Sequence, residues 1–348
     1  MNPYILAILL FGLGLGTTIT FASSHWLLAW MGLEINTLAI LPLMTQHHHP
    51  RAVEATTKYF LAQAAAAATI LFAGTTNAWL SGQWEIHQMS HPVPITMVTL
   101  ALALKIGLAP LHAWLPEVLQ GLDLTTGLIL STWQKLAPFA LLLQITPTNS
   151  ALLITLGLLS TLLGGWGGLN QTQLRKILAY SSIAHLGWMI LVLQFAPSLT
   201  LLALLTYLIM TSSTFLIFKL SKATTINMLA TSWTDSPVIA SLAPLVLLSL
   251  GGLPPLTGFM PKWLILQELT KHGLPLIATL AALSALLSLY FYLRISYAII
   301  LTASPNTLTG TTPWRFNSLQ FSLPLAIATS GTILLLPLTP AILTLLPS

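Results

Sequence analysis

Hydrophobic residues fill long stretches of this chain, and polar residues are concentrated in the short segments between them. Each stretch is about 20 residues long, the length that a helix needs to cross a hydrocarbon core of roughly 30 Å. The pattern predicts an all-α polytopic membrane protein with eleven transmembrane helices and mostly short connections. Their expected ranges are 3–22, 25–44, 57–80, 95–120, 124–145, 150–169, 174–194, 199–219, 238–270, 276–302 and 322–345.

The fourth and ninth stretches carry the same interruption. Residues 104–119 read LKIGLAPLHAWLPEVL, and residues 249–264 read SLGGLPPLTGFMPKWL. Proline breaks the hydrogen-bond ladder of a helix, and in lipid such a break survives only where protein or water satisfies the freed groups. Broken helices at matching positions of two halves are typical of transporter ion sites. The shared positions are Gly107 and Gly252, Leu108 and Leu253, Pro110 and Pro255, Leu111 and Leu256, Pro116 and Pro261, and Leu119 and Leu264.

Composition supports the membrane class. Of the 348 residues, 55% are hydrophobic and 5% are charged, whereas roughly a quarter of a soluble domain is charged. A soluble fold of this length could not cover its surface with so few charges. The chain has no cysteine, which excludes disulfides and thiolate metal sites. The first apolar stretch lacks a basic leader and a cleavage site, and it therefore reads as a first span.

The basic residues indicate how the chain is oriented. The net charge is +5, but the basic residues are spread along the chain and do not form a nucleic-acid patch. Eleven spans place the two termini on opposite sides, and the loops on the far side hold little beyond Lys271. The positive-inside rule therefore predicts an N-terminus on the inner, electrically negative face and a C-terminus outside. The basic residues of the N-terminal side are Arg51, Lys58, Arg175, Lys176, Lys219, Lys222 and Arg315.

Five ionisable residues are predicted to lie at similar depth in five different helices. Charge exposed to lipid at the bilayer centre costs several kcal/mol, so each of them needs a reason. We expect them to converge on an internal polar seam that carries protons. Glu34 is the expected partner of Lys105, which switches between charge states, and the other three are expected relay groups. The five are Glu34, Lys105, Lys135, His185 and Lys262.

The energetics of such a switch match a membrane potential. A lysine with a carboxylate partner stays charged, and a lysine without one in a dry site is driven toward its neutral form. Moving one charge across 100 mV costs about 2.3 kcal/mol, which is the scale of such a change in the charge state of a lysine.

A purely structural interpretation stays open for each residue alone, because lysines snorkel to the interface and buried histidines bond nearby carbonyls. Arg294 could also snorkel, and Glu117 and Asp123 are either proton entry groups or surface residues.

Other motifs predict no cofactor in this chain. His47, His48 and His49 precede Pro50 in a loop, but no carboxylate or cysteine joins them at the spacing of metal ligands, which favours a solvated loop. No Walker motif occurs, and no GxGxxG follows a strand. Haem-attachment and iron–sulfur motifs are missing too. The sequence therefore predicts neither metal nor cofactor here, and no redox chemistry of its own.

Five segments resemble the antiporter-like subunits of respiratory complex I, and the resemblance covers the whole chain. It implies a multi-pass subunit of the mitochondrial inner membrane, part of the proton-translocating NADH:ubiquinone reductase, in which these residues relay protons. The segments are WMGLEINTLAI around Glu34, ALKIGLAPLHAWLPEVLQG around Lys105, STWQKLAPF around Lys135, LRKILAYSSIAHLGWM around His185 and GGLPPLTGFMPKW around Lys262.

The resemblance also implies an architecture. The family fold has fourteen helices with a core of two inverted five-helix repeats, each containing a broken helix, whereas only eleven spans fit here. Three N-terminal helices would then be missing from a single membrane domain. Residues 3–145 would form the first repeat, 150–302 the second and 322–345 a terminal helix. The internal alignment places Lys262 on Glu117, so the repeats carry different charges and a symmetric mechanism is not expected.

The same resemblance implies that NADH, flavin, iron–sulfur clusters and ubiquinone bind to other subunits. The implied partners are the other membrane and accessory subunits of complex I and phospholipids, and no nucleic acid. Two further functions stay open from the residues alone. One is a cation/proton antiporter, which would transport without NADH, and the other is a scaffold, in which neutralising Lys105 would leave coupling intact.

Overall fold

The computed structural model describes residues 2–46, 49–89, 91–145, 150–233, 236–303 and 322–346. Within these ranges the regular structure is helical, and the only β-type pairings are two isolated bridges, between His25 and Glu85 and between Gln173 and Thr225. The all-helical prediction is therefore confirmed for the described residues. The chain divides into two compact units, Met1–Leu156 and Gly157–Ser348.

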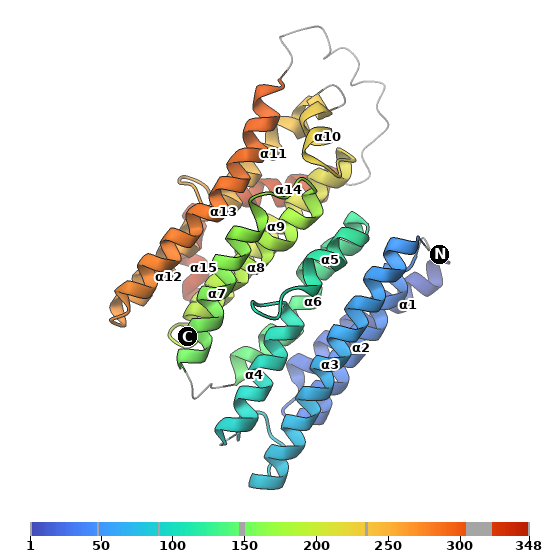
Figure 1. Ribbon diagram of the computed structural model, residues 1–348, viewed down its shortest axis with the longest axis vertical. Coiled ribbons are helices and arrows are strands. Elements are labelled where there is room, and N and C mark those ends of the chain that lie inside the picture. Colours follow the sequence, from blue (N-terminus) through green and yellow to red (C-terminus); the bar gives the residue numbers. More distant parts are fainter. Residues whose placement is uncertain are drawn as a thin grey trace. The chain divides into compact units, whose positions relative to one another are not determined.

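In unit 1, α3 lies between its neighbours and contacts α2, α4 and α5, while α1 packs along α2 (Figure 1). Each helix corresponds to a hydrophobic stretch of the sequence, and the fourth stretch is divided in two. The helices are α1 (Pro3–Ala22), α2 (Trp26–Met44), α3 (Pro50–Ser81), α4 (Pro92–Ile106), α5 (Trp114–Gly121), α6 (Leu124–Gln144) and the first turns of α7 (Ser150–Gly168).

In unit 2, α9 contacts α8, α11, α12 and α14, and α13 packs along α11. Nearly every residue of α8 is buried, which makes it the core helix of this unit. The elements are α8 (Leu174–Val192), α9 (Pro197–Leu220), α10 (Ile226–Ala230), η1 (Thr231–Trp233), α11 (Pro237–Gly251), α12 (Phe259–Lys271), α13 (Pro275–Leu301), α14 (Ser322–Leu334), η4 (Leu336–Leu338) and α15 (Thr339–Leu345).

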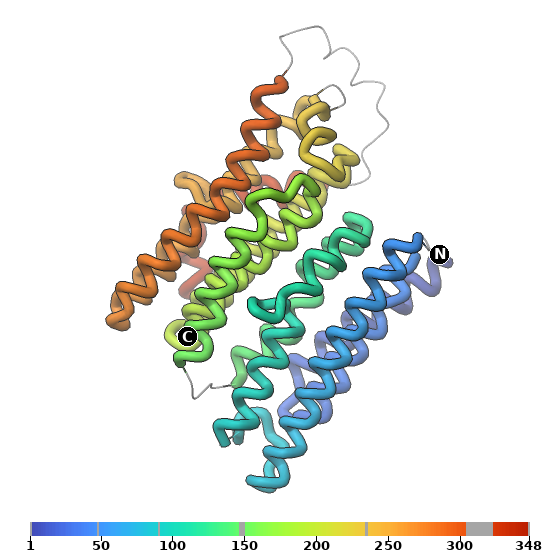
Figure 2. Tube along the Cα trace, viewed as in Figure 1, coloured from blue at the N-terminus to red at the C-terminus, as the bar shows by residue number. Residues whose placement is uncertain are grey.

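Both units contain a broken helix of the same construction (Figure 2). The first half ends at a glycine with positive φ, 87° at Gly107 and 81° at Gly252, which is the left-handed conformation that favours glycine. Each glycine N–H returns to the last turn of its helix, and the next residue bonds the carbonyl of Ala103 or Leu248. This is the Schellman type of helix end. A cis X–Pro bond follows in each, at Ala109–Pro110 and Pro254–Pro255.

Within the described ranges, six helices are long and apolar enough to cross a membrane: α1, α2, α3, α7, α9 and α13. A seventh candidate is the pair formed by Leu323–Leu334 and Leu336–Leu345, which is bent by 69°. The continuous helix expected over 322–345 is thus bent, because Pro337 cannot donate the backbone hydrogen bond that would carry the helix on. The total of eleven crossings stays a prediction.

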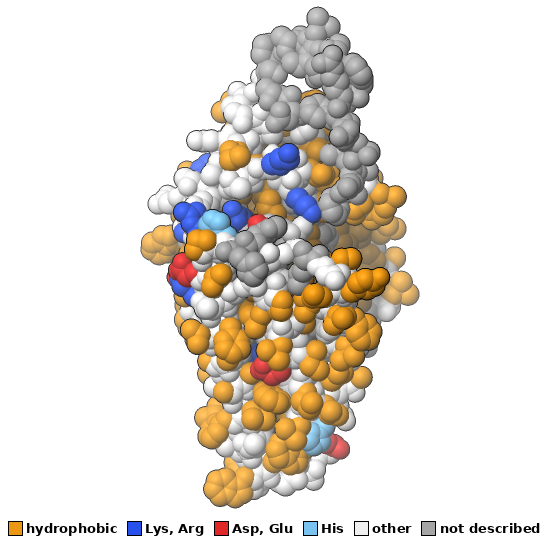
Figure 3. All heavy atoms as spheres, turned by 90° about the vertical axis from the view of Figure 1, so that its right-hand side faces the viewer, with side chains coloured by type: hydrophobic (Ala, Val, Ile, Leu, Met, Phe, Trp, Pro, Cys, Tyr) orange, Lys and Arg blue, Asp and Glu red, His pale blue; other side chains and the backbone are white. Residues whose placement is uncertain are grey.

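The outer surface is strongly apolar. On α1, Tyr4, Ile8 and Phe11 are all more than two thirds exposed, at the spacing of one helix face. On the face that Figure 3 shows, hydrophobic side chains are densest over the lower half, where charged side chains are few. Such a surface needs lipid or protein against it, as expected for a multi-pass membrane protein.

Candidate functional site

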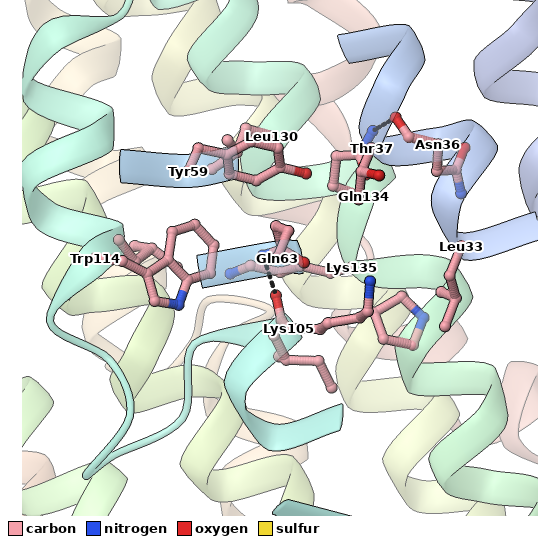
Figure 4. Close-up of a pocket in the computed structure, with 13 residues that line it drawn as sticks. Leu33, Asn36, Thr37, Tyr59, Gln63, Lys105, Trp114, Leu130, Gln134 and Lys135 are labelled. Carbon is pink, nitrogen blue, oxygen red and sulfur yellow. Dashed lines mark hydrogen bonds between the residues drawn. The ribbon is translucent and has the colours of Figure 1, made fainter. Parts of the chain in front are cut away.

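Unit 1 encloses a cavity of about 20 Å³ at the break between α4 and α5. Side chains of α2, α3, α4, α5 and α6 line it (Figure 4). Lys105 and Lys135 both reach it, and they are only 6% and 3% exposed. The structure therefore brings two of the predicted lysines, from α4 and α6, to one cavity.

The cavity holds polar atoms that lack partners. The Lys105 Nζ is buried with no hydrogen-bond partner, and so are the Nδ2 and Oδ1 atoms of Asn36. A cavity of this volume has room for one water molecule, provided that two or more polar groups can bind it. Lys105 and the other polar side chains that line it, such as Gln134 and Lys135, supply such groups. The site can thus hold a proton carrier beside the lysine.

Two side chains satisfy the carbonyls that the break leaves at the end of α4. Gln63 of α3 donates from Nε2 to the Lys105 carbonyl at 3.2 Å, and Trp114 of α5 donates from Nε1 to the Leu104 carbonyl at 3.0 Å (Figure 4 shows the first). The last carbonyls of any helix lack a partner within the helix. These two donors therefore fix the backbone from which the Lys105 side chain extends.

Replacing Trp114 with phenylalanine is expected to destabilise this helix end. The Leu104 carbonyl would lose its side-chain donor and keep the Gly107 N–H at 3.2 Å, so the cost is that of one hydrogen bond, about 0.5–1.5 kcal/mol. The temperature at which the chain is lost from its assembled complex on native gels should fall. Trp79→Phe is the matched control, because Trp79 is 89% exposed. An equal fall in both variants would contradict the assignment.

Glu34 is placed differently from the two lysines. It is half-buried on α2, and the Thr37 hydroxyl donates to its Oε2 at 3.2 Å. It is not among the residues that line the cavity, and in the described part of the chain no ion pair joins Glu34 to Lys105. The expected pairing of Glu34 with Lys105 stays a prediction.

A second cavity of about 20 Å³ lies in unit 2, where it is lined by His185 of α8, Thr206 of α9 and Lys262 of α12. Lys262 extends back across the break, and its Nζ donates to the Leu250 carbonyl at 3.3 Å and the Gly251 carbonyl at 2.8 Å. A cation at the C-terminal end of a helix is favoured by the helix dipole. Unit 2 therefore brings together the remaining two predicted site residues, His185 and Lys262.

The two charged residues that align between the breaks, Glu117 and Lys262, lie in different surroundings. Glu117, which aligns with Lys262, points to the surface and accepts from Lys58 at 2.7 Å. Lys58 also binds Glu54 at 2.8 Å. These side chains are between 41% and 64% exposed, where ion pairs contribute little to stability. The expected lack of charge symmetry between the halves is thus visible in the geometry.

The other residues singled out in the sequence have local roles. The Arg294 guanidinium donates to the carbonyls of Leu169 and Gln171, just after α7. His49 caps α3, with its Nδ1 accepting from the Arg51 N–H at 3.2 Å. His47 and His48 lie outside the described residues. Among the described residues, no three histidine or acidic side chains are grouped for a metal ion.

Sequence reasoning missed Asn36, Gln63 and Trp114. A signal existed for Gln63, since it precedes a run of five alanines and is a lone polar side chain in an apolar stretch. Asn36 follows Glu34 by two residues within a hydrophobic stretch, which is a weaker signal. For Trp114 no pattern distinguishes a hydrogen-bonding indole from a packing one.

The chain as a whole is similar to known proteins. Residues 23–288 match the family model described as NADH:quinone oxidoreductase/Mrp antiporter, TM, and residues 289–343 match NADH dehydrogenase subunit 2 C-terminus. The chain is 76% identical to NADH-ubiquinone oxidoreductase chain 2 of Tetraodon nigroviridis and 74% identical to that of Oncorhynchus mykiss, over 99% of every chain. It is also similar to a chain of respiratory complex I from Thermus thermophilus, with a TM-score of 0.86, 29% identity, and coverage of 98% of this chain and 80% of that one.

Proposed function

Because the chain belongs to the NADH–ubiquinone oxidoreductase chain 2 family, we propose that Glu34, Lys105, Lys135, His185 and Lys262 are the groups through which it moves protons. The chain is a membrane subunit of respiratory complex I and takes part in proton translocation coupled to electron transfer from NADH to ubiquinone. It is thus part of an NADH:ubiquinone reductase. Its own contribution is the handling of protons.

The observation that carries the proposal is the cavity at the first break. Two lysines reach one small cavity, and the Nζ of Lys105 has no hydrogen-bond partner among the described residues. A buried ammonium without a partner is held at a high free energy, and losing its proton relieves that cost. A lysine in this position can therefore release and regain a proton when a nearby charge changes. Lys135 is the neighbouring group able to take part in the exchange.

The second cavity supports the same chemistry in unit 2. Histidine is the residue type whose side chain changes charge near neutral pH without a large perturbation by its surroundings. His185 shares a cavity with Lys262, and that cavity has room for one water molecule. A proton can pass between an imidazole and an amine through one such water. Each unit thus holds its own proton-exchanging pair.

The proposal includes an architecture and an orientation. Residues 3–145 and 150–302 form two inverted five-helix repeats, followed by the terminal helix, in one eleven-span membrane domain. The matching left-handed glycines of the two breaks support this reading. The N-terminus lies on the matrix side of the mitochondrial inner membrane and the C-terminus on the intermembrane-space side.

The proposal also covers partners and cofactors. Other membrane and accessory subunits of complex I, together with phospholipids, cover the exposed apolar faces. NADH, flavin, the iron–sulfur clusters and ubiquinone bind on other subunits. The lack of cysteine in this chain supports that arrangement, because iron–sulfur clusters are held mainly by cysteine thiolates.

A Glu34→Gln substitution tests the carboxylate of the proposed set. The amide oxygen still accepts from the Thr37 hydroxyl, so packing is kept while the exchangeable proton and the negative charge are lost. We expect NADH-driven proton translocation by the assembled complex in vesicles to fall by on the order of tenfold, below the 10²–10⁴-fold typical of acid–base groups because Glu34 is only half-buried. Glu85→Gln is the control, because Glu85 is exposed. Wild-type translocation by the Glu34 variant would remove Glu34 from the set.

A further inference from the structure

The loop between α11 and α12 is bonded to the C-terminal helix α14. Thr257 of this loop is 2% exposed, and its hydroxyl donates to the Thr332 carbonyl at 2.7 Å. Thr332 is itself fully buried. The bond joins residues 75 positions apart, and both of them belong to unit 2. The second break therefore has a partner outside the two helices that it separates.

This bond differs from those that buried hydroxyls commonly make in the described part of the chain. The Ser249 hydroxyl donates to the Val246 carbonyl at 2.6 Å, and the Thr206 hydroxyl donates to the Ala203 carbonyl at 3.0 Å. Bonds of that kind satisfy a hydroxyl within its own helix and do not fix one helix against another. The Thr257 hydroxyl instead connects two elements, so its removal would loosen a tertiary contact.

The carbonyl that Thr257 binds is available because α14 ends beside it. The last four carbonyls of a helix lack a partner within that helix, and α14 ends at Leu334. A straight helix would bring the N–H of Leu336 to the Thr332 carbonyl. The chain bends by 69° between the helix that ends at Leu334 and the helix that starts at Leu336. The bend thus leaves an acceptor, and the second break supplies the donor.

Helix α14 is a firm support for this bond. It contacts α9 and α11, and it packs closely on α9, because a Cβ at Gly331 would come 3.0 Å from the Ile209 side chain. Its buried residues recur at the spacing of one helix face: Leu325, Ala328, Thr329 and Thr332. Since other helices hold α14 in place, the Thr257 bond ties the start of α12 to a fixed element.

The start of α12 carries this restraint to Lys262. Gly258 follows Thr257 and lines the second cavity, and it lies so close to the Ser249 carbonyl of α11 that a Cβ would not fit. Lys262 lies one helical turn after Gly258, so its backbone moves with the start of the helix. Its side chain then reaches the end of α11 and the cavity that it shares with His185.

We propose that Thr257 is a positioning residue, through which α14 holds Lys262 in place beside the cavity that it shares with His185. This inference rests on the proposed function of Lys262. Thr257 does not line the cavity, so it acts through the backbone of α12 and not as a proton carrier. A displacement of a reacting group by about 1 Å can slow a reaction on the order of 100-fold, so one bond at this point can change the rate.

The test compares two substitutions of Thr257 in the assembled complex. Valine keeps the shape of threonine and removes the hydroxyl, whereas serine keeps the hydroxyl. In vesicles, Thr257→Val should slow NADH-driven proton translocation by about tenfold, less than the cost of a full 1 Å misplacement because α11 still holds the Lys262 amine. Thr257→Ser should restore most of the rate. Thr270→Val is the matched control, because Thr270 is exposed on the same helix and bonds the Gln267 carbonyl.

A double variant separates positioning from packing. If Thr257 acts through Lys262, adding Thr257→Val to Lys262→Met should slow translocation no further. Losses that multiply, or a Thr257→Ser variant as slow as the valine variant, overturn the positioning role. Wild-type translocation in Thr257→Val with slow translocation in Lys262→Met also overturns it and leaves the proposed function standing. Wild-type translocation in Lys262→Met overturns both.

Pro337→Ala tests the bond from its other side, and it decides if native gels show that Thr257→Val does not assemble. Pro337 is exposed, and alanine supplies the backbone donor that lets α14 continue past the bend. The N–H of Leu336 would then compete with the Thr257 hydroxyl for the Thr332 carbonyl. Slow translocation that Lys262→Met does not deepen supports the proposal. Wild-type translocation, or a loss that multiplies with that of Lys262→Met, overturns it.

Discussion

Replacing Lys105 with methionine is expected to lower NADH-driven proton translocation by on the order of 100-fold, at the lower end of the range for acid–base groups, while the complex still assembles. The Lys105 Nζ makes no hydrogen bond, so its removal breaks none. Methionine fills a similar volume in the cavity, and a buried charge that is replaced by an apolar group often leaves stability unchanged or improved. Function and stability should therefore separate at this position.

The measurement is the number of protons moved per NADH oxidised, together with the turnover rate, in vesicles that carry the complex. Assembly is checked on native gels. Lys271→Met is the matched control: Lys271 is 57% exposed and its one ion pair among the described residues is with Glu268, so its loss should cost at most about 1 kcal/mol. Normal turnover and stoichiometry in Lys105→Met would favour the scaffold function. Transport by the purified chain without NADH would favour the antiporter.

The positions of the helices could be predicted from the sequence because the membrane imposes a simple rule. A run of about 20 apolar residues must satisfy its backbone internally, and a helix does this without help from the rest of the chain. The two breaks were also predictable, since Gly107 with Pro110 and Gly252 with Pro255 carry their own conformational constraints. The bend in the last predicted span was missed because hydropathy does not register the missing donor of Pro337.

The candidate site was predictable only in part. The burial of Lys105 and Lys135 follows from their place in apolar stretches, and the structure brings them to one cavity. Their backbone partners were not predictable, because Gln63 and Trp114 reach the end of α4 from other helices. Periodicity within one helix carries no information about such contacts. The return of Lys262 to the carbonyls of its own broken helix likewise depends on the angle between α11 and α12.

The different surroundings of Lys105 and Lys262 lead to a different expectation for Lys262→Met. At this position the amine binds the carbonyls of Leu250 and Gly251 at the C-terminal end of α11. Methionine would leave both without that donor, at about 1–3 kcal/mol for each buried acceptor. We therefore expect Lys262→Met to lower both proton translocation, by on the order of 100-fold, and the temperature at which the chain leaves the complex.

Lys262→Arg separates the two roles of this residue. Arginine keeps a positive charge and several donors for the carbonyls, but it does not lose its proton in proteins. If Lys262 exchanges protons, the arginine variant should recover much of the thermal stability and remain as slow as Lys262→Met. If Lys262 only holds α11 and α12 together, translocation should return along with stability. The Lys262 side chain lies directly against Gly252, so the larger arginine side chain has to fit into the same space. The thermal stability and the translocation rate of Lys262→Arg are therefore measured in the same preparation.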